Sequence, residues 1–143
     1  MEDRRLAVTA WEALFRAQVD VMRHLSHEFP NQGISLNEYD VLLTMSREPD
    51  RRIRLRDLNT QVLLSQPSIS RLVDRLVARG FVGKCPDPDD GRGTLVRMTD
   101  EGYSVFRKVA VQHGASIAER VSTALSPEEM STLAALSNKL RGS

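Results

Sequence analysis

Apolar side chains recur at helical spacing along both ends of the chain. From residue 4 to residue 29 they return every three or four positions, which predicts one long helix that ends at the Pro-Asn-Gln-Gly stretch 30–33. Thr99 and Ser126 are predicted to cap two more helices toward the C-terminus. The apolar positions of these three helices are Leu6, Ala10, Leu14, Val21, Leu25 and Phe29; Phe106, Val109, Ala110, Ile117 and Val121; and Met130, Leu133, Leu136 and Leu140.

Shorter elements are predicted between these long helices. Ser35 and Glu38 have the spacing of a capping box, which predicts a short second helix. Ile53, set between arginines, is typical of a short exposed strand, and a third helix follows. A fourth helix is predicted to begin at Ser65 and to end at Gly80. The apolar positions of this fourth helix are Ile69, Leu72, Val73, Leu76 and Val77.

A hairpin follows the fourth helix. The strand-like runs FVGKC and TLVRMT flank the charged segment PDPDDGRG, whose two glycines are expected to free the backbone to turn. The predicted order is helix, helix, strand, helix, helix, hairpin, helix, helix. We therefore expect a mainly α fold with a small β-hairpin wing, in which a winged helix-turn-helix is joined to a helical region.

Composition narrows the class of protein. A length of 143 residues suits one integrated domain, and the single cysteine, Cys85, excludes a disulfide within the chain. The sequence has no apolar run near the roughly 20 residues that span a membrane, and its N-terminal stretch lacks the apolar core of a signal peptide. We expect a cytoplasmic protein with no membrane partner.

Positive charge is concentrated in the middle of the chain. Residues 47–97 hold eleven Lys and Arg against seven Asp and Glu, although the net charge of the whole chain is only +1. This distribution favours a partner that is a polyanion.

The polar face of the fourth helix suits the major groove of DNA. Arg71 and Arg75 lie one turn apart and can reach phosphates or a guanine, and backbone N–H groups at the helix start can hold a phosphate. The alternative is that both arginines are solvated and paired with Asp74 or Asp57. The DNA-binding candidates on this helix are Ser65, Gln66, Pro67, Ser68, Ser70, Arg71 and Arg75.

The hairpin supplies one more candidate. Arg92 is predicted at its tip, where an arginine can enter a narrow minor groove. Asp90 is expected to pair with Arg92 or another arginine and so to support the shape of the wing. The alternative is a solvated acidic loop.

These motifs resemble the MarR family of bacterial transcription regulators over residues 35–102. The pattern S-R-L-V-D-R-L-x-x-x-G-F-V is similar to the family's recognition helix and first wing strand, and D-G-R-G-x-x-V-x-M-T-x-x-G to its wing. Gly91 departs from the family by replacing the first arginine of the usual Asp-Arg-Arg, and Cys85 stands where a basic residue is frequent.

The resemblance implies a homodimer on a pseudo-palindromic operator in double-stranded DNA. Residues 1–34 and 100–143 would form the helical dimerisation region, and residues 35–99 the DNA-binding lobe. The terminal helices also carry more apolar surface than a small winged domain can cover alone. The candidates for the dimer interface are Trp11, Leu133, Leu136 and Leu140.

The resemblance also implies a small aromatic anionic effector, which would release a repressor from DNA. The same side chains are alternatively part of the core. The candidates for the effector pocket are Phe15, Met22, His24, Tyr39, Phe106 and His113.

Other chemistry is not expected. His24 and His27 are compatible with a metal pair but lack further ligands, so we expect no metal and no cofactor. No phosphate-binding loop or nucleophile motif points to an enzyme. The favoured function is a DNA-binding regulator, and the alternative is a winged-helix protein-interaction module that does not bind DNA. The operator, the regulated genes and the choice between repressor and activator stay open.

Overall fold

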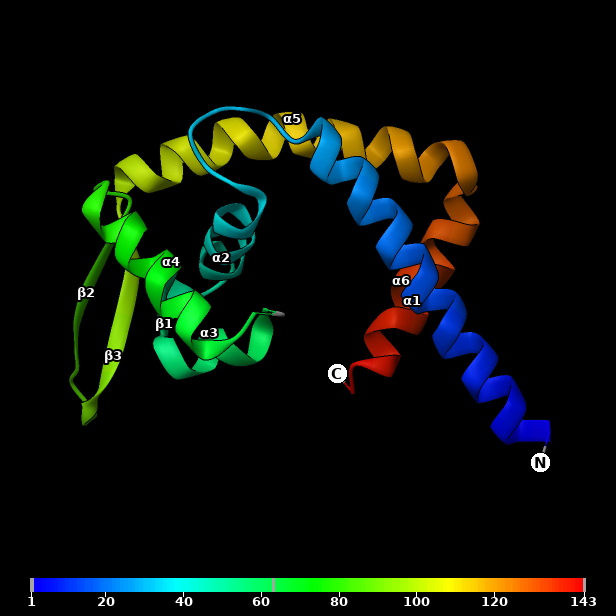
Figure 1. Cartoon of the computed structure of the whole chain (residues 1–143), viewed down its shortest axis with the longest axis horizontal. Coiled ribbons are helices and arrows are strands. Elements are labelled where there is room, and N and C mark those ends of the chain that lie inside the picture. The colour runs from blue at the N-terminus through cyan, green and yellow to red at the C-terminus, as the bar shows by residue number, and fades with distance from the viewer. Residues whose placement is uncertain (1, 63, 143) are drawn as a thin grey trace. The chain divides into compact units, whose positions relative to one another are not determined.

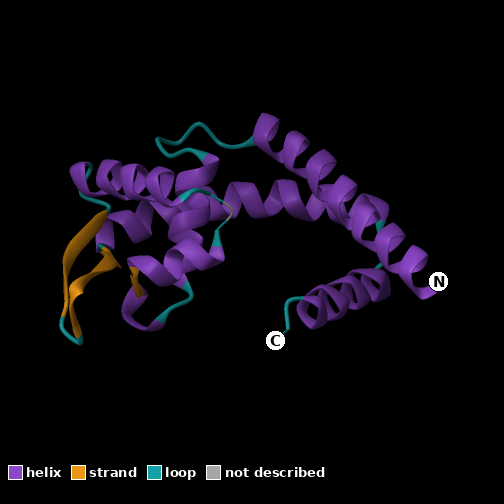
Figure 2. Ribbon diagram, turned by 60° about the horizontal axis from the view of Figure 1, so that its bottom comes forward, coloured by secondary structure: helices purple, strands orange, loops and turns teal. Residues whose placement is uncertain are grey.

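The structure is a computed structural model that describes residues 2–62 and 64–142. It is mainly helical with a three-stranded antiparallel sheet, so the predicted fold class is confirmed (Figure 1; Figure 2). The elements are α1 (Glu2–Glu28), α2 (Leu36–Ser46), the 3-10 turn η1 (Pro49–Arg51), β1 (Arg52–Arg54), α3 (Leu55–Gln61), α4 (Gln66–Ala78), β2 (Val82–Asp87), β3 (Asp90–Met98), α5 (Asp100–Ala124) and α6 (Pro127–Leu140).

The chain divides into two compact units. One unit comprises residues 30–111, and the other comprises residues 1–29 together with 112–143. Helix α5 is continuous and contributes its first half to one unit and its second half to the other.

The unit of residues 30–111 holds most of the buried apolar side chains. Helix α2 begins as predicted. The Ser35 backbone N–H donates to Glu38 Oε1 at 2.8 Å, and the Glu38 N–H donates to Ser35 Oγ at 3.1 Å. The buried side chains come from every helix and strand of the unit. They include Val41, Leu42, Met45, Ile53, Leu58, Ile69, Leu72, Val73, Leu76, Val82, Val96, Met98, Phe106 and Val109.

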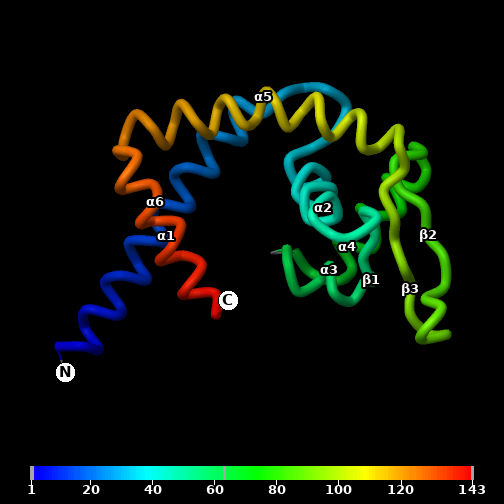
Figure 3. Tube along the Cα trace, turned by 180° about the vertical axis from the view of Figure 1, so that it is seen from behind, coloured from blue at the N-terminus to red at the C-terminus, as the bar shows by residue number. Residues whose placement is uncertain are grey.

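The sheet has the strand order β1-β3-β2. Strand β1 pairs only with residues 95–97 of β3, with Ile53 opposite Val96. Strand β2 continues alongside β3 to the end of the hairpin. The far part of the hairpin therefore consists of two strands, and it extends as a narrow ribbon (Figure 3).

A tight joint connects α4, the hairpin and α5. Thr99 Oγ1 donates to the Gly80 carbonyl at 2.7 Å and accepts from the Gly102 N–H at 3.0 Å, which confirms Thr99 as the cap of α5. Gly80 ends α4 with a φ of 81°, a conformation that favours glycine. A Cβ on Gly102 would overlap the carbonyl oxygen of Phe81, so only glycine fits there without a backbone shift.

The second unit buries few of its apolar side chains. Leu25 is the only buried residue of α1, and α6 buries none of its fourteen residues. The exposed large apolar side chains of this unit are Leu6, Val8, Trp11, Phe15, Val19, Met22, Ile117, Leu133, Leu136 and Leu140.

Two glycines of α5 give opposite predictions for stability. Gly102→Ala should lower the free energy of unfolding by about 1–3 kcal/mol because the added methyl collides with backbone. Gly114→Ala, where a Cβ meets nothing within 4 Å, should raise it by about 0.5–1 kcal/mol through the better helix propensity of alanine. Denaturant unfolding of both variants checks this, and equal effects would contradict the tight joint.

Candidate nucleic-acid interface

The start of α4 is held by its own side chains. Ser65 adopts an extended conformation, and its Oγ accepts from the Ser68 backbone N–H at 3.3 Å while donating to Ser68 Oγ at 2.8 Å. Pro67 lies in the first turn, where its missing N–H costs no helical hydrogen bond. The predicted beginning of this helix is confirmed.

The two faces of α4 differ sharply in burial. Ile69, Leu72, Val73 and Leu76 are each at most 2% exposed and pack into the core. The candidates that face outward are exposed at Gln66, Pro67, Arg71 and Arg75 and half-buried at Ser68 and Ser70.

Among the described residues, the arginines on the outward face, Arg71 and Arg75, have no carboxylate partner. Asp74 pairs with Lys84 of β2 at 2.7 Å, not with the arginine that follows it. Arg71 reaches only Ser68 Oγ, at 3.5 Å, and neither Arg71 nor Arg75 forms an ion pair with any residue that the structure describes. Both guanidinium groups are therefore available to phosphates or base edges.

The hairpin turns at Pro88 and Asp89, before the glycines that were expected to turn it. Asp87 pairs with Asp90 and Pro86 with Thr94, so residues 91–93 form a bulge in β3. Neither glycine of the bulge has a positive φ, so the sequence interpretation of these glycines as turn residues is wrong. Arg92 is exposed and lies in this bulge beside the turn.

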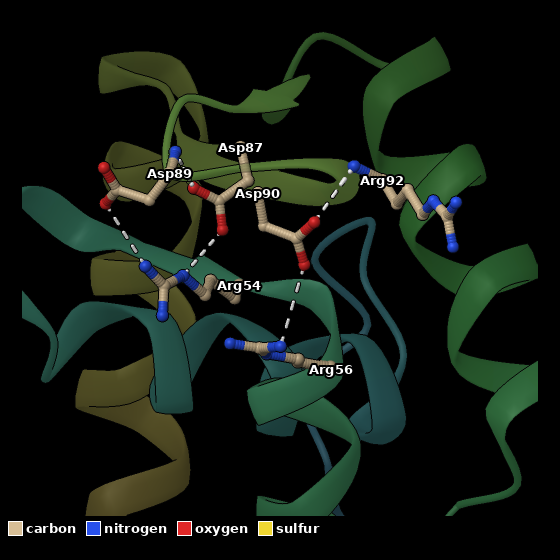
Figure 4. A network of polar contacts seen from close by, with 6 residues as sticks. All are labelled: Arg54, Arg56, Asp87, Asp89, Asp90 and Arg92. Carbon is tan, nitrogen blue, oxygen red and sulfur yellow. Dashed lines mark hydrogen bonds and ion pairs between the residues drawn. The ribbon is translucent and has the colours of Figure 1, made fainter.

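Asp90 contacts the backbone of Arg92 and a different arginine side chain. Its Oδ1 accepts from the Arg92 N–H at 3.1 Å, and its Oδ2 lies 3.8 Å from Arg56 Nη1 of α3. The Arg92 side chain extends away from these groups, as Figure 4 shows. Among the described residues it forms no ion pair, which leaves its charge available to a ligand.

A second carboxylate anchors the turn. Asp87 is buried, and its Oδ1 accepts from the Asp89 N–H at 3.0 Å while its Oδ2 lies 2.6 Å from Arg54 Nε (Figure 4). Arg54 Nη2 also lies 3.3 Å from Asp89 Oδ2.

The surroundings of Asp87 favour its charged form. The Asp89 N–H lowers the pKa of Asp87 below its ordinary value of 3.8; burial opposes this effect, and the charge of Arg54 adds to it. Because the folded-state pKa is depressed, these contacts stabilise the fold above about pH 4, and the contribution is lost as the pH falls through the folded-state pKa.

The candidates for an effector pocket lie in two different environments. Tyr39 and Phe106 are buried and stacked in the unit of residues 30–111, with ring centroids 5.4 Å apart, and burial followed by the charge of Asp40 raises the pKa of Tyr39. In the unit of residues 1–29 and 112–143, called the helical unit below, His113 is buried against Phe29, whereas Phe15 and Met22 are exposed.

His24 of the same unit is held by two neighbours. If Nδ1 donates to the Asp20 carbonyl at 2.9 Å, Nε2 can accept from Arg120 Nη2 at 3.2 Å. The helical unit contains a cleft of about 720 Å³ lined by Val21, Arg120 and Leu133 among others, and none of the six candidates is among its lining residues.

The four candidates for the dimer interface are all exposed apolar residues. Trp11 is 57% exposed on α1, and on α6 Leu133, Leu136 and Leu140 are 45%, 59% and 67% exposed. Exposed apolar side chains gathered on one surface are typical of a site that another molecule covers.

The described residues form neither a metal site nor a membrane-spanning helix. Within residues 2–62 and 64–142, no three His, Cys, Asp or Glu side chains are placed to hold a metal ion. No described helix is both long and apolar enough to cross a bilayer.

Sequence reasoning missed Arg54, Arg56 and Asp87. The turn at Asp87 carries a local signal, since an aspartate often accepts from the N–H two residues later. The pairing with Arg54, which is 33 positions away in the chain, has no such signal because it depends on the register of the sheet.

The comparisons with known proteins agree with this geometry. The family model described as MarR family matches residues 32–93. The HTH-type transcriptional regulator YkoM of Bacillus subtilis, itself described as uncharacterized, is 28% identical over 96% of this chain and 88% of its own length.

Two solved structures from Streptomyces coelicolor are similar over nearly the whole chain. Sco3205, a MarR family transcriptional regulator in complex with DNA, is 27% identical with a TM-score of 0.78, covering 93% of this chain and 84% of that one. The PcaV transcriptional regulator, in complex with its natural ligand, is 27% identical with a TM-score of 0.72, covering 91% and 90%.

Proposed function

Because the chain belongs to the MarR family of winged helix-turn-helix transcriptional regulators, we propose that it is a homodimeric repressor that a small-molecule effector releases from its operator. The family consists of DNA-binding regulators and not of enzymes, as the sequence predicted. In this proposal residues 35–99 form the DNA-binding lobe, and residues 1–34 and 100–143 form the dimerisation region. In this proposal the regulator acts in the cytoplasm, because the DNA that it binds lies there.

The observation that carries the docking mode is that Arg71 and Arg75 of α4 and Arg92 of the wing form no ion pair with any described residue. Arg71 and Arg75 project from a helix whose other face is buried, and such a helix fits the major groove. Gln66 near the helix start can read a purine edge, and Ser65, Ser68 and Ser70 can bond phosphates or bases. Arg92 enters the adjacent minor groove, where negative potential is strongest. The structure of Sco3205 in complex with DNA supports DNA as the ligand of this surface.

The homodimer is supported by the apolar surface of α1 and α6. Two recognition helices related by a two-fold axis would read half-sites about 34 Å apart, one turn of DNA, which accounts for a pseudo-palindromic operator. The cleft beside Leu133 gives the partner's apolar side chains a place to pack.

Substitution of the arginines tests the docking mode. Arg71→Ala should weaken binding to the tightest duplex that the parent selects from a random pool by about 1–3 kcal/mol and should relax base preference at one position in each half-site. Arg92→Ala should weaken binding mainly through AT-rich flanks. Fluorescence anisotropy at several salt concentrations measures both effects. If both variants bind as tightly as the parent, the proposed contacts are wrong.

A charge on α6 tests the dimer. The parent should have a solution mass of two 16.1 kDa chains. Leu136→Asp should dissociate the dimer because the carboxylate cannot be buried between apolar helices. Ser131→Asp, an exposed polar position on the same helix, is the matched control. Sedimentation measures the masses, and a monomeric parent would contradict the proposal.

The effector is proposed to be a small aromatic anion, as the family resemblance implies. The structure of PcaV in complex with its natural ligand supports a ligand site in a protein of this fold. Of the candidates, Phe15, Met22, His24 and His113 belong to the unit of residues 1–29 and 112–143, where they offer apolar surface and imidazole groups to such an anion. Tyr39 and Phe106 stack in the core of the other unit. An aromatic acid should raise the unfolding temperature and weaken DNA binding, whereas cyclohexanecarboxylate, with the same charge and no aromatic ring, should do less. A panel of aromatic acids that leaves both quantities unchanged would contradict this part of the proposal.

A further inference from the structure

The outer part of the wing lacks the packing that holds the rest of the sheet. Strand β1 reaches only residues 95–97 of β3, so residues 86–94 have no third strand beside them. A two-stranded ribbon on its own is marginally stable in water. A fixed position of Arg92 therefore depends on contacts other than those of the sheet.

The shortest ion pair of the wing joins Arg54 to Asp87. The Asp87 side chain is 3% exposed and lies at the point where the regular pairing of β2 and β3 ends. A carboxylate buried this far is stable only with charged or hydrogen-bonding partners, and Arg54 Nε at 2.6 Å supplies the charge. The contact fastens the end of β2 to the junction of β1 and α3.

A parallel set of contacts reaches Arg92 itself. Arg56 Nη1 lies 3.8 Å from Asp90, and Asp90 accepts from the backbone N–H of Arg92 at 3.1 Å (Figure 4). Both arginines come from residues 54–56, so one short segment holds both sides of the turn.

The place of Arg54 in the sequence also indicates a role in the wing. It is the N-cap residue of α3, a position where Ser, Thr, Asp and Asn normally satisfy the first backbone N–H groups. Arg54 makes no capping hydrogen bond and directs its guanidinium to Asp87 and Asp89 instead.

We propose that Arg54 and Asp87 are positioning residues for DNA binding, a brace that holds the wing so that Arg92 meets the minor groove. The proposal rests on the proposed role of Arg92 and adds two residues that do not themselves touch DNA. The competing explanation is that Arg54 contacts a phosphate directly.

A double-mutant cycle separates these explanations. Dissociation constants of Arg54→Ala, Arg92→Ala and the double variant are measured on the duplex that the parent selects from a random pool. Arg54→Ala alone should weaken binding about fivefold or more, as loss of a groove contact does. In the Arg92→Ala background, Arg54→Ala should lower DNA affinity by no more than Arg52→Ala does. Arg52 is the control because it is an exposed arginine of the same strand and forms no ion pair with any described residue. If the cost of Arg54→Ala persists in full without Arg92, the positioning role is wrong.

The salt dependence gives an independent readout. In the Arg92→Ala background, further loss of Arg54 should leave the slope of log K against log salt unchanged. A direct phosphate contact would reduce the magnitude of that slope by about 0.9 for each protomer bound.

The sharpest test is whether Asp87→Asn raises or lowers the affinity for DNA. Asp87→Asn removes negative charge near DNA, which by charge alone should tighten binding. The brace predicts weaker binding, because the neutral amide keeps the turn hydrogen bond but loses the ionic contact with Arg54. Asp50→Asn is the matched control, since Asp50 is exposed, pairs with no described residue and has a left-handed φ of 58° that asparagine tolerates.

The outcomes distinguish this inference from the proposed function. Thermal unfolding first confirms that each variant is folded. If Asp87→Asn binds as tightly as Asp50→Asn, the brace is wrong although the parent binds DNA. If the parent itself selects no duplex, the proposed function fails and the brace with it.

Discussion

Burial of one face of α4 determines where the charged groups of this protein point. Ile69, Leu72, Val73 and Leu76 are almost fully removed from water, and each such burial contributes about 1.5–3 kcal/mol. Rotating the helix would expose these side chains, so the outward direction of Arg71 and Arg75 is fixed by the core beneath them. The surface proposed to read DNA is thus a consequence of packing on the opposite side.

The outer part of the wing is held in place by polar contacts and not by apolar packing. Its outer part has only two strands, and Asp87 and Asp90 tie it to arginines at the start of α3. In these contacts each carboxylate lies against the guanidinium group of an arginine. Asp87 and Asp90 therefore act within the wing as partners of arginines, and not as free negative charges.

The helices and their caps were predictable because they depend on neighbours in the chain. The spacing of Ile69 to Leu76 and the capping boxes at Ser35 and Ser126 are local patterns, and the structure has them. The contact of Arg54 with Asp87 was not predictable, since it depends on which strands pair and in which register. Asp90 was expected to support the wing by pairing with an arginine. The structure adds its bond to the Arg92 backbone, a contact that depends on the turn lying at Pro88 and Asp89.

Dimethyl sulfate footprinting tests most directly whether α4 and the wing bind adjacent grooves of the duplex that the protein selects from a random pool. The reagent methylates guanine N7 in the major groove and adenine N3 in the minor groove, and a bound protein protects the atoms that it covers. We expect protection of guanine N7 at two places about 34 Å apart and of adenine N3 in the flanks outside them. Protection of guanine without any protection of adenine would contradict entry of the wing into the minor groove. Protection of neither base would contradict the binding mode as a whole.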